Sequence, residues 1–252
     1  MPSTVDGARE LMGIVANTIG TWSADNSKVA GQVLTIAGTF DYLAIRAIHK
    51  VTGGFAVDSH LANVVQEADG TGIALQLWAY VYPNNIDKQV QAIADAFSVV
   101  PGATDLILDA EGEWEGVDGS VAESLCSGII DATGNALDLS LSSFYAPALH
   151  DTFPFESFCK HCNGGWMPQP YVHGDGEGNS LSLVLNRCLS QSVASKTVNG
   201  NLIPTLDDPR QPAMFKGHCS GFNAWLWEGS GSDPAVRDNL EAWQAAIADF
   251  KS

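Results

Sequence analysis

The stretch IALQLWAYVYPNNIDKQVQAIADAFSVVPGATDLILDAEGEWEG, residues 73–116, decides the fold. It begins with a strand pattern over 73–82, continues with a helical pattern over 86–99, and ends with a second strand pattern over 105–111. Apolar residues recur at strand spacing, then at helical spacing, then at strand spacing again. This strand–helix–strand order is typical of a parallel sheet that is covered by helices.

The same alternation extends over the rest of the chain. Ser180 and Asp233–Pro234 are typical starts of helices. Eight strands in 252 residues predict an α/β fold, a single (β/α)8 TIM-type barrel, with one domain over 1–252. An open doubly wound sheet is the alternative, but the sequence has no GxGxxG or P-loop pattern to favour it. The further strand patterns cover 11–17, 42–48, 137–145, 166–171, 201–206 and 222–228, and the further helical patterns cover 27–39, 59–69, 119–132, 180–196 and 234–250.

Composition excludes several classes of partner. The formal net charge of −17 repels nucleic acids and anionic membranes, so we expect binding to neither. No apolar stretch reaches the roughly 18 residues that a membrane span needs. The N-terminal residues lack the pattern of a secretory signal, so we expect synthesis in the cytoplasm without a signal peptide.

The five cysteines predict reduced thiols, because their count is odd and no secretory signal accompanies them. CKHC (159–162) has the spacing of half a zinc site, and HC (218–219) could supply the other half. A second CxxC is missing from the sequence. We therefore expect no bound metal and no cofactor.

DLILDAE (105–111) carries the candidate chemistry. Alternation along a strand places Leu106, Leu108 and Ala110 toward the outer helices and turns Asp109 and Glu111 into the barrel. The two Cα atoms would lie roughly 6–7 Å apart at the carboxyl end of the strand, where barrel active sites lie. Neighbouring carboxylates raise the pKa of one of them, as a general acid requires. Arg46 could keep Asp109 ionised; the alternative is an internal ion pair beside a solvated acidic loop.

Aromatic residues are concentrated on the same predicted inner faces and loops. Sugar rings stack on aromatic faces, so this distribution favours a carbohydrate cleft, with packing inside the barrel as the alternative. The predicted ring consists of Trp78, Tyr80, Tyr82, Trp114, Trp225 and Trp227.

Two parts of the chain resemble known proteins. YLAIRAIHKVTGGFAVDSHLANVVQEADGTGIALQLWAYVYP (42–83) is similar to the family 25 glycoside hydrolases, the lysozyme-like muramidases of bacteria and phages. LILDAEGEWEG (106–116), followed by LSLSSFYAPALHDTFPFESFCKHCNGGWMPQPY (139–171), resembles uncharacterised bacterial and phage proteins of the wider glycoside hydrolase barrel superfamily. Those proteins carry DAE, SSY and MPQxY motifs.

The resemblance implies roles for particular residues. Glu111 would be the proton donor and Asp109 its partner, and the cleft would include Tyr145, Gln169 and Tyr171. One departure is Asn17, which stands where the muramidases have an aspartate. The second carboxylate of a hydrolase is also not evident. The candidates for it are Glu113, Asp207 and Glu228.

The leading hypothesis is a glycoside hydrolase that acts on cell-wall, peptidoglycan-type glycan, as an endolysin or a tail-associated enzyme. The alternative is a non-catalytic glycan-binding or structural component of a phage particle or injection machine, with other virion subunits as partners. Either protein would act at the cell wall or in a released particle. A metal-dependent hydrolase ranks last, because the six histidines show no HxH or HExxH spacing.

Overall fold

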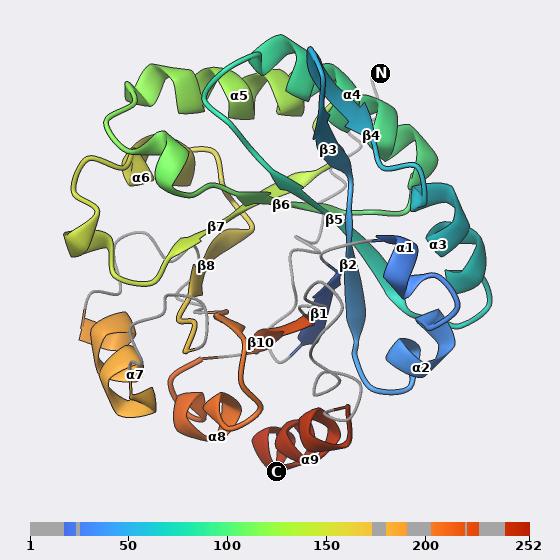
Figure 1. The fold of residues 1–252 in the computed structure, drawn as a ribbon, viewed down its shortest axis with the longest axis vertical. Coiled ribbons are helices and arrows are strands. Elements are labelled where there is room, and N and C mark those ends of the chain that lie inside the picture. The colour runs from blue at the N-terminus through green and yellow to red at the C-terminus, as the bar shows by residue number, and fades with distance from the viewer. Residues whose placement is uncertain (1–17, 24–25, 173–179, 191–202, 220, 227–239) are drawn as a thin grey trace, which may run out of the picture.

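The computed structural model describes residues 18–23, 26–172, 180–190, 203–219, 221–226 and 240–252. Eight parallel strands form a nearly closed (β/α)8 barrel, as predicted (Figure 1). Their order around the barrel is β8-β7-β6-β5-β2-β1-β10-β9. The strands are β1 (Ile19–Ser23), β2 (Tyr42–Arg46), β5 (Ala74–Tyr80), β6 (Asp105–Asp109), β7 (Asp138–Phe144), β8 (Gly165–Gln169), β9 (Thr205–Leu206) and β10 (Phe222–Leu226).

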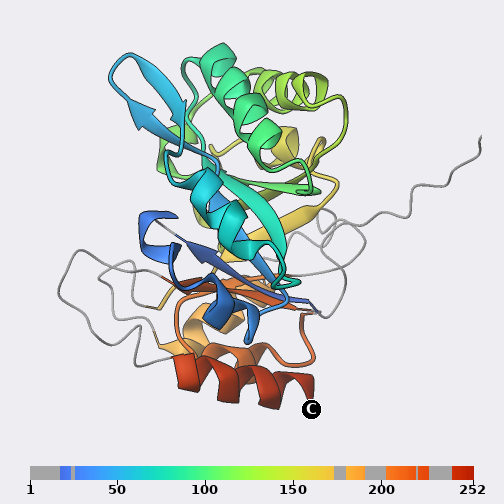
Figure 2. The ribbon, with the colours of Figure 1, turned by 90° about the vertical axis from the view of Figure 1, so that its right-hand side faces the viewer.

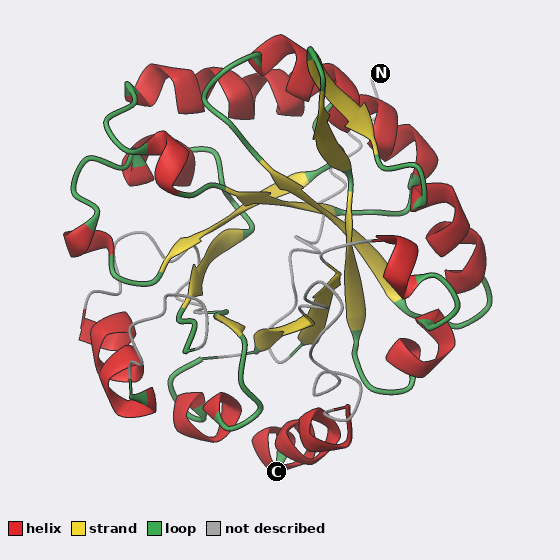
Figure 3. Ribbon diagram, in the orientation of Figure 1, coloured by secondary structure: helices red, strands yellow, loops and turns green. Residues whose placement is uncertain are grey.

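The helices surround the strands (Figure 3). Ser180 caps α7 as predicted, since its Oγ accepts a hydrogen bond from the Leu183 amide at 3.3 Å. None of the described helices is long and apolar enough to cross a membrane. The helices are α1 (Asn26–Val29), α2 (Val33–Ala37), α3 (Leu61–Ala68), α4 (Ile86–Val99), α5 (Gly119–Ala132), α6 (Phe155–Cys159), α7 (Leu181–Ser190), α8 (Gln211–Phe215) and α9 (Leu240–Lys251), with short 3-10 turns η1 (Gly112–Trp114) and η2 (Pro147–Leu149).

The predicted helices over 86–99 and 119–132 have the predicted bounds. The predicted strand over 11–17 lies outside the described residues, as does Asn17, and the first described strand is β1 at 19–23. Of the predicted strand over 201–206, residues 203–206 are described, and among these 205–206 pair with β10. The Asp233–Pro234 helix start also lies outside the described part of the chain.

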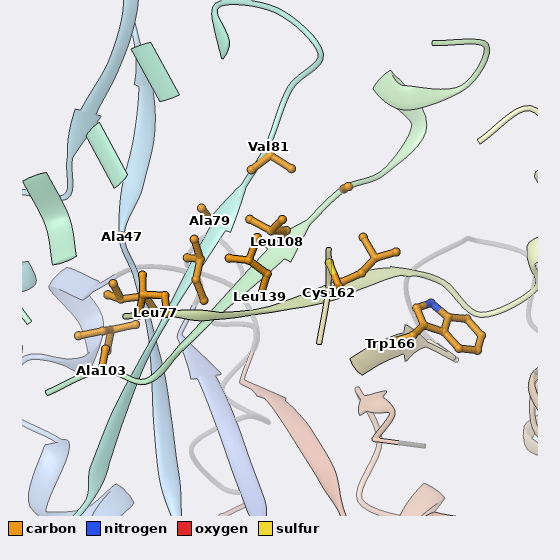
Figure 4. Packing of buried hydrophobic residues seen from close by; sticks show 14 of the residues in the cluster. Ala47, Leu77, Ala79, Val81, Ala103, Leu108, Leu139, Cys162 and Trp166 are labelled. Carbon is orange, nitrogen blue, oxygen red and sulfur yellow. The ribbon is translucent and has the colours of Figure 1, made fainter. Parts of the chain in front are cut away.

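Strand alternation separates two apolar clusters, as predicted. The outer face of the barrel packs against the helices through fully buried side chains such as Leu77, Leu108 and Leu139 (Figure 4). Burying these side chains contributes roughly 1.5–3 kcal/mol each. The inner face forms a separate cluster within the barrel. Its buried members are Trp22, Tyr42, Ala44, Trp78, Ile107, Met167 and Ile203.

Gly20 and Tyr42 form a close contact inside the barrel. Tyr42 is 4% exposed, and its hydroxyl donates to the side-chain oxygen of Asn223 on β10, past Gly20 on the intervening β1. A Cβ atom at position 20 would overlap the Tyr42 ring. Glycine is therefore required on β1 because the ring of the neighbouring strand fills the space where a side chain would lie.

The barrel has a seam between β8 and β9, the two ends of the strand order. A buried side chain bridges the loops that follow these strands. Nε2 of Gln211 donates to the Pro170 carbonyl at 2.6 Å, and its Oε1 accepts from the amides of Asp207 and Asp208 at 3.0 and 2.9 Å. One of these hydrogen bonds crosses the seam, and the other two fix the segment that follows β9.

A β-hairpin that was not predicted follows β2. It consists of β3 (Ile48–Val51) and β4 (Gly54–Val57), paired antiparallel, and it projects from the body of the barrel (Figure 2). The Lys88 ammonium donates to the Gly53 carbonyl at 2.6 Å, which fastens the hairpin turn to α4. The hairpin stands beside Tyr82, whose ring centroid lies 5.7 Å from that of Phe55.

Candidate active site

β6 places Asp109 on the inner face of the barrel, at the carboxyl end of the strand. Its neighbours Leu108 and Ala110 belong to the outer cluster, which confirms the predicted alternation. The ladder continues past the strand end, because the Ala110 amide donates to the Ser142 carbonyl at 3.0 Å. Asp109 is only 3% exposed. A nearly buried carboxyl group on a rigid strand end is thus the starting point of the site.

Gln169, from the end of β8, is the hydrogen-bond donor to this carboxyl group. Its Nε2 donates to Asp109 Oδ1 at 2.7 Å and to Ser142 Oγ at 3.0 Å. Burial raises the pKa of Asp109 well above its usual value, and the nearby charge of Glu111 raises it further. The hydrogen bond from Gln169 lowers the Asp109 pKa, against these effects. Asp109 of β6, Ser142 of β7 and Gln169 of β8 therefore form one hydrogen-bonded group.

Glu111 and Glu113 lie just beyond the strand. Glu111 is partly exposed and has an extended backbone before the η1 turn, whereas Glu113 is exposed. The Tyr80 hydroxyl, from β5, donates to Glu113 Oε2 at 2.6 Å. Partial burial raises the pKa of Tyr80, followed by its hydrogen bond to Glu113 and the charge of Glu111. Tyr80 is thus a neutral donor that anchors the acidic segment above Asp109.

The predicted role of Arg46 needs correction. Arg46 is the last residue of β2. Its guanidinium is bound to Asp58, with Nε and Nη2 at 2.8 and 2.7 Å from Oδ2. That arginine therefore does not hold Asp109 ionised, and burial, followed by the charge of Glu111, raises the pKa of Asp109. The sequence could not reveal this pairing, because Asp58 belongs to the loop after the unpredicted hairpin.

Three tryptophans meet inside the lumen. Trp22 stacks on Trp78 with ring centroids 5.6 Å apart, and Trp225 contacts both, at 5.5 and 6.0 Å. Tyr171 extends the group, with its ring 6.2 Å from that of Trp225. Trp78 and Trp225 were predicted here, whereas Trp22 was missed because the first strand had been placed at 11–17. Trp225 and Tyr171 are partly exposed, so they form the accessible side of this aromatic group.

A second aromatic group leads from the acidic segment to the hairpin. The rings of Tyr80 and Tyr82 lie 5.1 Å apart. Tyr82 also contacts Phe55, and the Lys50 ammonium lies 4.3 Å from the centroid of the Tyr82 ring. Both tyrosines are partly exposed, as expected of a cleft wall.

Other predicted site residues lie elsewhere. Trp114 is fully buried outside the barrel, where its indole donates to the Val81 carbonyl at 2.9 Å, so it does not line the mouth. Tyr145 is 9% exposed and packs in the same outer cluster. Asp207 accepts the Val172 amide at 2.8 and 3.1 Å and holds the loop after β8. Trp227 and Glu228 lie outside the described residues.

The cysteines form two groups of free thiols. Cys162 is buried, and a hydrogen bond with Cys126, followed by burial, raises its pKa. Burial raises the pKa of Cys188 to about 12, with a further contribution from Cys219. Within the described ranges, no three His, Cys, Asp or Glu side chains are grouped so that they could hold a metal ion.

Comparison with known proteins shows similarity in structure. No protein-family model and no curated protein matches the sequence. Active domain 2 of the chitinase from Pyrococcus furiosus has a TM-score of 0.64 at 12% identity, covering 94% of this chain and 96% of that one. A family GH18 chitinase from the fern Peteris ryukyuensis has a TM-score of 0.60 at 13% identity, covering 91% and 98%. A sugar phosphate isomerase/epimerase from Parabacteroides distasonis has a TM-score of 0.53 at 12% identity, covering 94% and 98%. At these identities the similarity establishes the barrel fold that this chain shares with them.

Proposed function

We propose that this protein is a glycosidase-like hydrolase of cell-wall, peptidoglycan-type glycan. The observation that carries the proposal is the pair of carboxyl groups at the end of β6, with Asp109 buried and Glu111 partly exposed beside it. The tryptophan and tyrosine groups at the same mouth offer stacking surfaces for sugar rings. The shared fold with two chitinases supports a polysaccharide substrate.

Glu111 is the proposed proton donor. Its partial exposure lets it reach the oxygen of the scissile glycosidic bond, which it protonates as the bond to the anomeric carbon breaks. Asp109 sits deeper and is fixed by Gln169, so its carboxylate faces the reacting sugar without moving. Glu111, deprotonated by the first step, then takes a proton from the attacking water.

The nucleophile comes from the substrate in this proposal. Some glycoside hydrolases lack a carboxylate nucleophile and use a group of the substrate itself. In a 2-acetamido sugar the acetamido oxygen attacks the anomeric carbon, and the leaving oxygen takes the proton of Glu111. Asp109 accepts the acetamido N–H and balances the positive charge that develops on the ring formed. Chitin and peptidoglycan both contain such sugars. Glu113 and Asp207 are the described carboxylates that remain as alternatives.

The resemblance to family 25 muramidases and the phage context remain predictions. They imply action at the cell wall after release, as an endolysin, or as part of a phage particle with other virion subunits. A barrel that binds glycan without cleaving it is the alternative outcome.

Turnover of peptidoglycan and of chito-oligosaccharides by the wild type, Glu111→Gln and Glu113→Gln tests the proposal. Glu111→Gln keeps the volume and hydrogen bonding of the side chain but cannot deliver a proton, so turnover should fall about 10²–10⁴-fold with binding retained. Glu113→Gln is the matched comparison and should lose far less, because its amide oxygen still accepts the Tyr80 hydroxyl; an equal loss would instead make Glu113 the second carboxylate. Equal turnover by wild type and Glu111→Gln would remove Glu111 from the mechanism. Binding without any turnover by the wild type would establish the non-catalytic alternative.

A further inference from the structure

Gln169 has both of its amide hydrogens committed within the barrel. One N–H points to Asp109 Oδ1 at 2.7 Å and the other to Ser142 Oγ at 3.0 Å. Gln169 is 7% exposed and Ser142 is fully buried, so water does not compete readily for these bonds. Because Ser142 sits beside Asp109 in the register of β6 and β7, the amide is held from two adjacent strands. Its orientation is fixed with the nitrogen toward Asp109.

The location of one proton decides what the carboxyl pair can do. Asp109 and Glu111 repel each other when both are ionised, and the burial of Asp109 adds to the cost. Such a pair keeps one proton over a range of pH, and that proton resides on either carboxyl group. A proton on Glu111 is available to a leaving group at the mouth. A proton on Asp109 is not, because that group lies deeper on the strand end and acts in the proposed mechanism as an ionised acceptor of the acetamido N–H.

We propose that Gln169 is a positioning residue that stabilises the ionised form of Asp109 and so shifts the shared proton of the pair toward Glu111. The proposal rests on the hydrolase function proposed above. It adds the residue that favours the protonated form of the proton donor, Glu111. A donor N–H favours the charged form of a carboxyl group, and a hydrogen bond to a charged group is stronger than one to a neutral group.

The surroundings of Asp109 leave this role to Gln169. Burial and the charges of Glu111 and Glu113 all raise the pKa of Asp109, whereas the Gln169 hydrogen bond lowers it. Tyr80 and Tyr82 face the same acidic groups, and the burial and negative charges that act on both raise their pKa values, so they stay neutral. The Arg46 guanidinium is bound to Asp58.

Direct titration of the Asp109 carboxyl group tests the proposal without any need for activity. The carboxyl carbon is followed by NMR in aspartate-labelled protein and assigned with Asp109→Asn. Gln169→Leu should raise the pKa of Asp109 further and change the ratio of the two singly protonated forms by about 10-fold or more. Ser142→Ala, which only frees the amide to rotate, should shift it in the same direction by less. This second variant keeps the test available if Gln169→Leu folds poorly.

Ser143→Ala is the matched control. Ser143 is as deeply buried as Ser142 and lies on the same strand, β7, but its hydroxyl donates to the Ala110 carbonyl at 2.6 Å. Its loss should therefore leave the Asp109 titration unchanged. No shift in Gln169→Leu, or an equal shift in Ser143→Ala, overturns the proposal whether or not the protein is a hydrolase.

The pH profile of hydrolysis adds the catalytic readout. Protonation of Asp109 ends activity on the acid side, so a less well stabilised carboxylate moves the acid limb of the kcat profile to higher pH. Gln169→Leu should show this shift, a kcat about 10-fold lower, and an unchanged KM. A lower kcat with an unmoved acid limb would indicate a structural role, and a raised KM alone would indicate sugar binding. Either result contradicts the proposal. An inactive wild type with a shifted titration would refute the hydrolase function and leave the role of Gln169 intact.

Discussion

Replacing Gln211 with leucine should open the seam of the barrel. Gln211 is 1% exposed and makes three hydrogen bonds with backbone groups, one of which crosses the seam to Pro170. Leucine has a similar volume, so the change removes the bonds without leaving a large cavity. The Pro170 carbonyl and the amides of Asp207 and Asp208 then lose their partner.

The expected cost follows from these three groups. A buried polar group left without a partner costs about 1–3 kcal/mol, and water that enters the seam keeps each value near the lower limit. The sum is then about 3 kcal/mol of unfolding free energy. For a chain of this size that corresponds to a fall in Tm of about 6–12 °C. Because Pro170 directly follows Gln169, the loss should also loosen the group that holds Asp109.

Thermal and urea denaturation measure the cost, and hydrogen exchange of the amides of β8 and β9 locates it. Gln89→Leu is the control. Gln89 is fully buried and also makes three bonds, with Tyr82 N, Tyr82 O and Asn84 O at 2.9, 2.8 and 2.7 Å, but it lies away from the seam. Gln89→Leu should lower the free energy of unfolding by a similar amount, while hydrogen exchange in β8 and β9 stays slow.

A loss below about 1 kcal/mol in Gln211→Leu would refute the assignment of this residue as the seam closure. So would faster exchange of β8 and β9 in Gln89→Leu to the same extent, since the effect would then be general destabilisation.

Three further predictions concern stability and metal content. Burial raises the pKa of Asp109 in the folded state, so its stabilising contribution is complete below the unfolded pKa and is lost as pH rises through the folded one. Asp109→Asn should therefore gain stability relative to wild type as pH rises, in urea titrations at several pH values, and a constant difference would contradict this. Gly20→Ala should cost about 1–3 kcal/mol in the same assay, because the added methyl group overlaps Tyr42, and much less in a Tyr42→Ala background. Purified protein should contain no stoichiometric zinc by elemental analysis, and one zinc per chain would show that CKHC (159–162) is a metal site.

Long periodic segments made the fold predictable. The helix over 86–99 repeats its apolar residues at helical spacing for several turns, and the flanking strands carry an uninterrupted apolar outer face. Because side chains alternate along a strand, the apolar outer face shows which residues point inward. The inward direction of Asp109 therefore followed from Leu106 and Leu108. The hairpin over 48–57, which turns at Thr52–Gly53, was missed because its strands of four residues are too short for a clear alternation.

The partners of the polar side chains were not predictable in the same way. Arg46 and Asp58 are separated by a hairpin, and Gln169 and Asp109 by 60 residues, so no local pattern connects them. Trp114 illustrates the opposite error. It follows the acidic residues in sequence, but the η1 turn directs its indole outward into the core. Buried glutamines such as Gln211 resemble surface residues by composition, and only the tertiary structure gives them their hydrogen bonds.

The three lumen tryptophans also give the molecule an optical signature. Indole transitions on rings 5.5–6.0 Å apart interact, so Trp22, Trp78 and Trp225 should produce a coupled signal in circular dichroism. Trp225 alone among them is partly exposed, and a sugar that stacks on it would change both this signal and the intrinsic fluorescence. Trp114, Trp166 and Trp243 are buried in the outer core and would contribute a constant background. Ligand entry into the barrel can thus be followed without any attached label, through the absorption and fluorescence of these tryptophans.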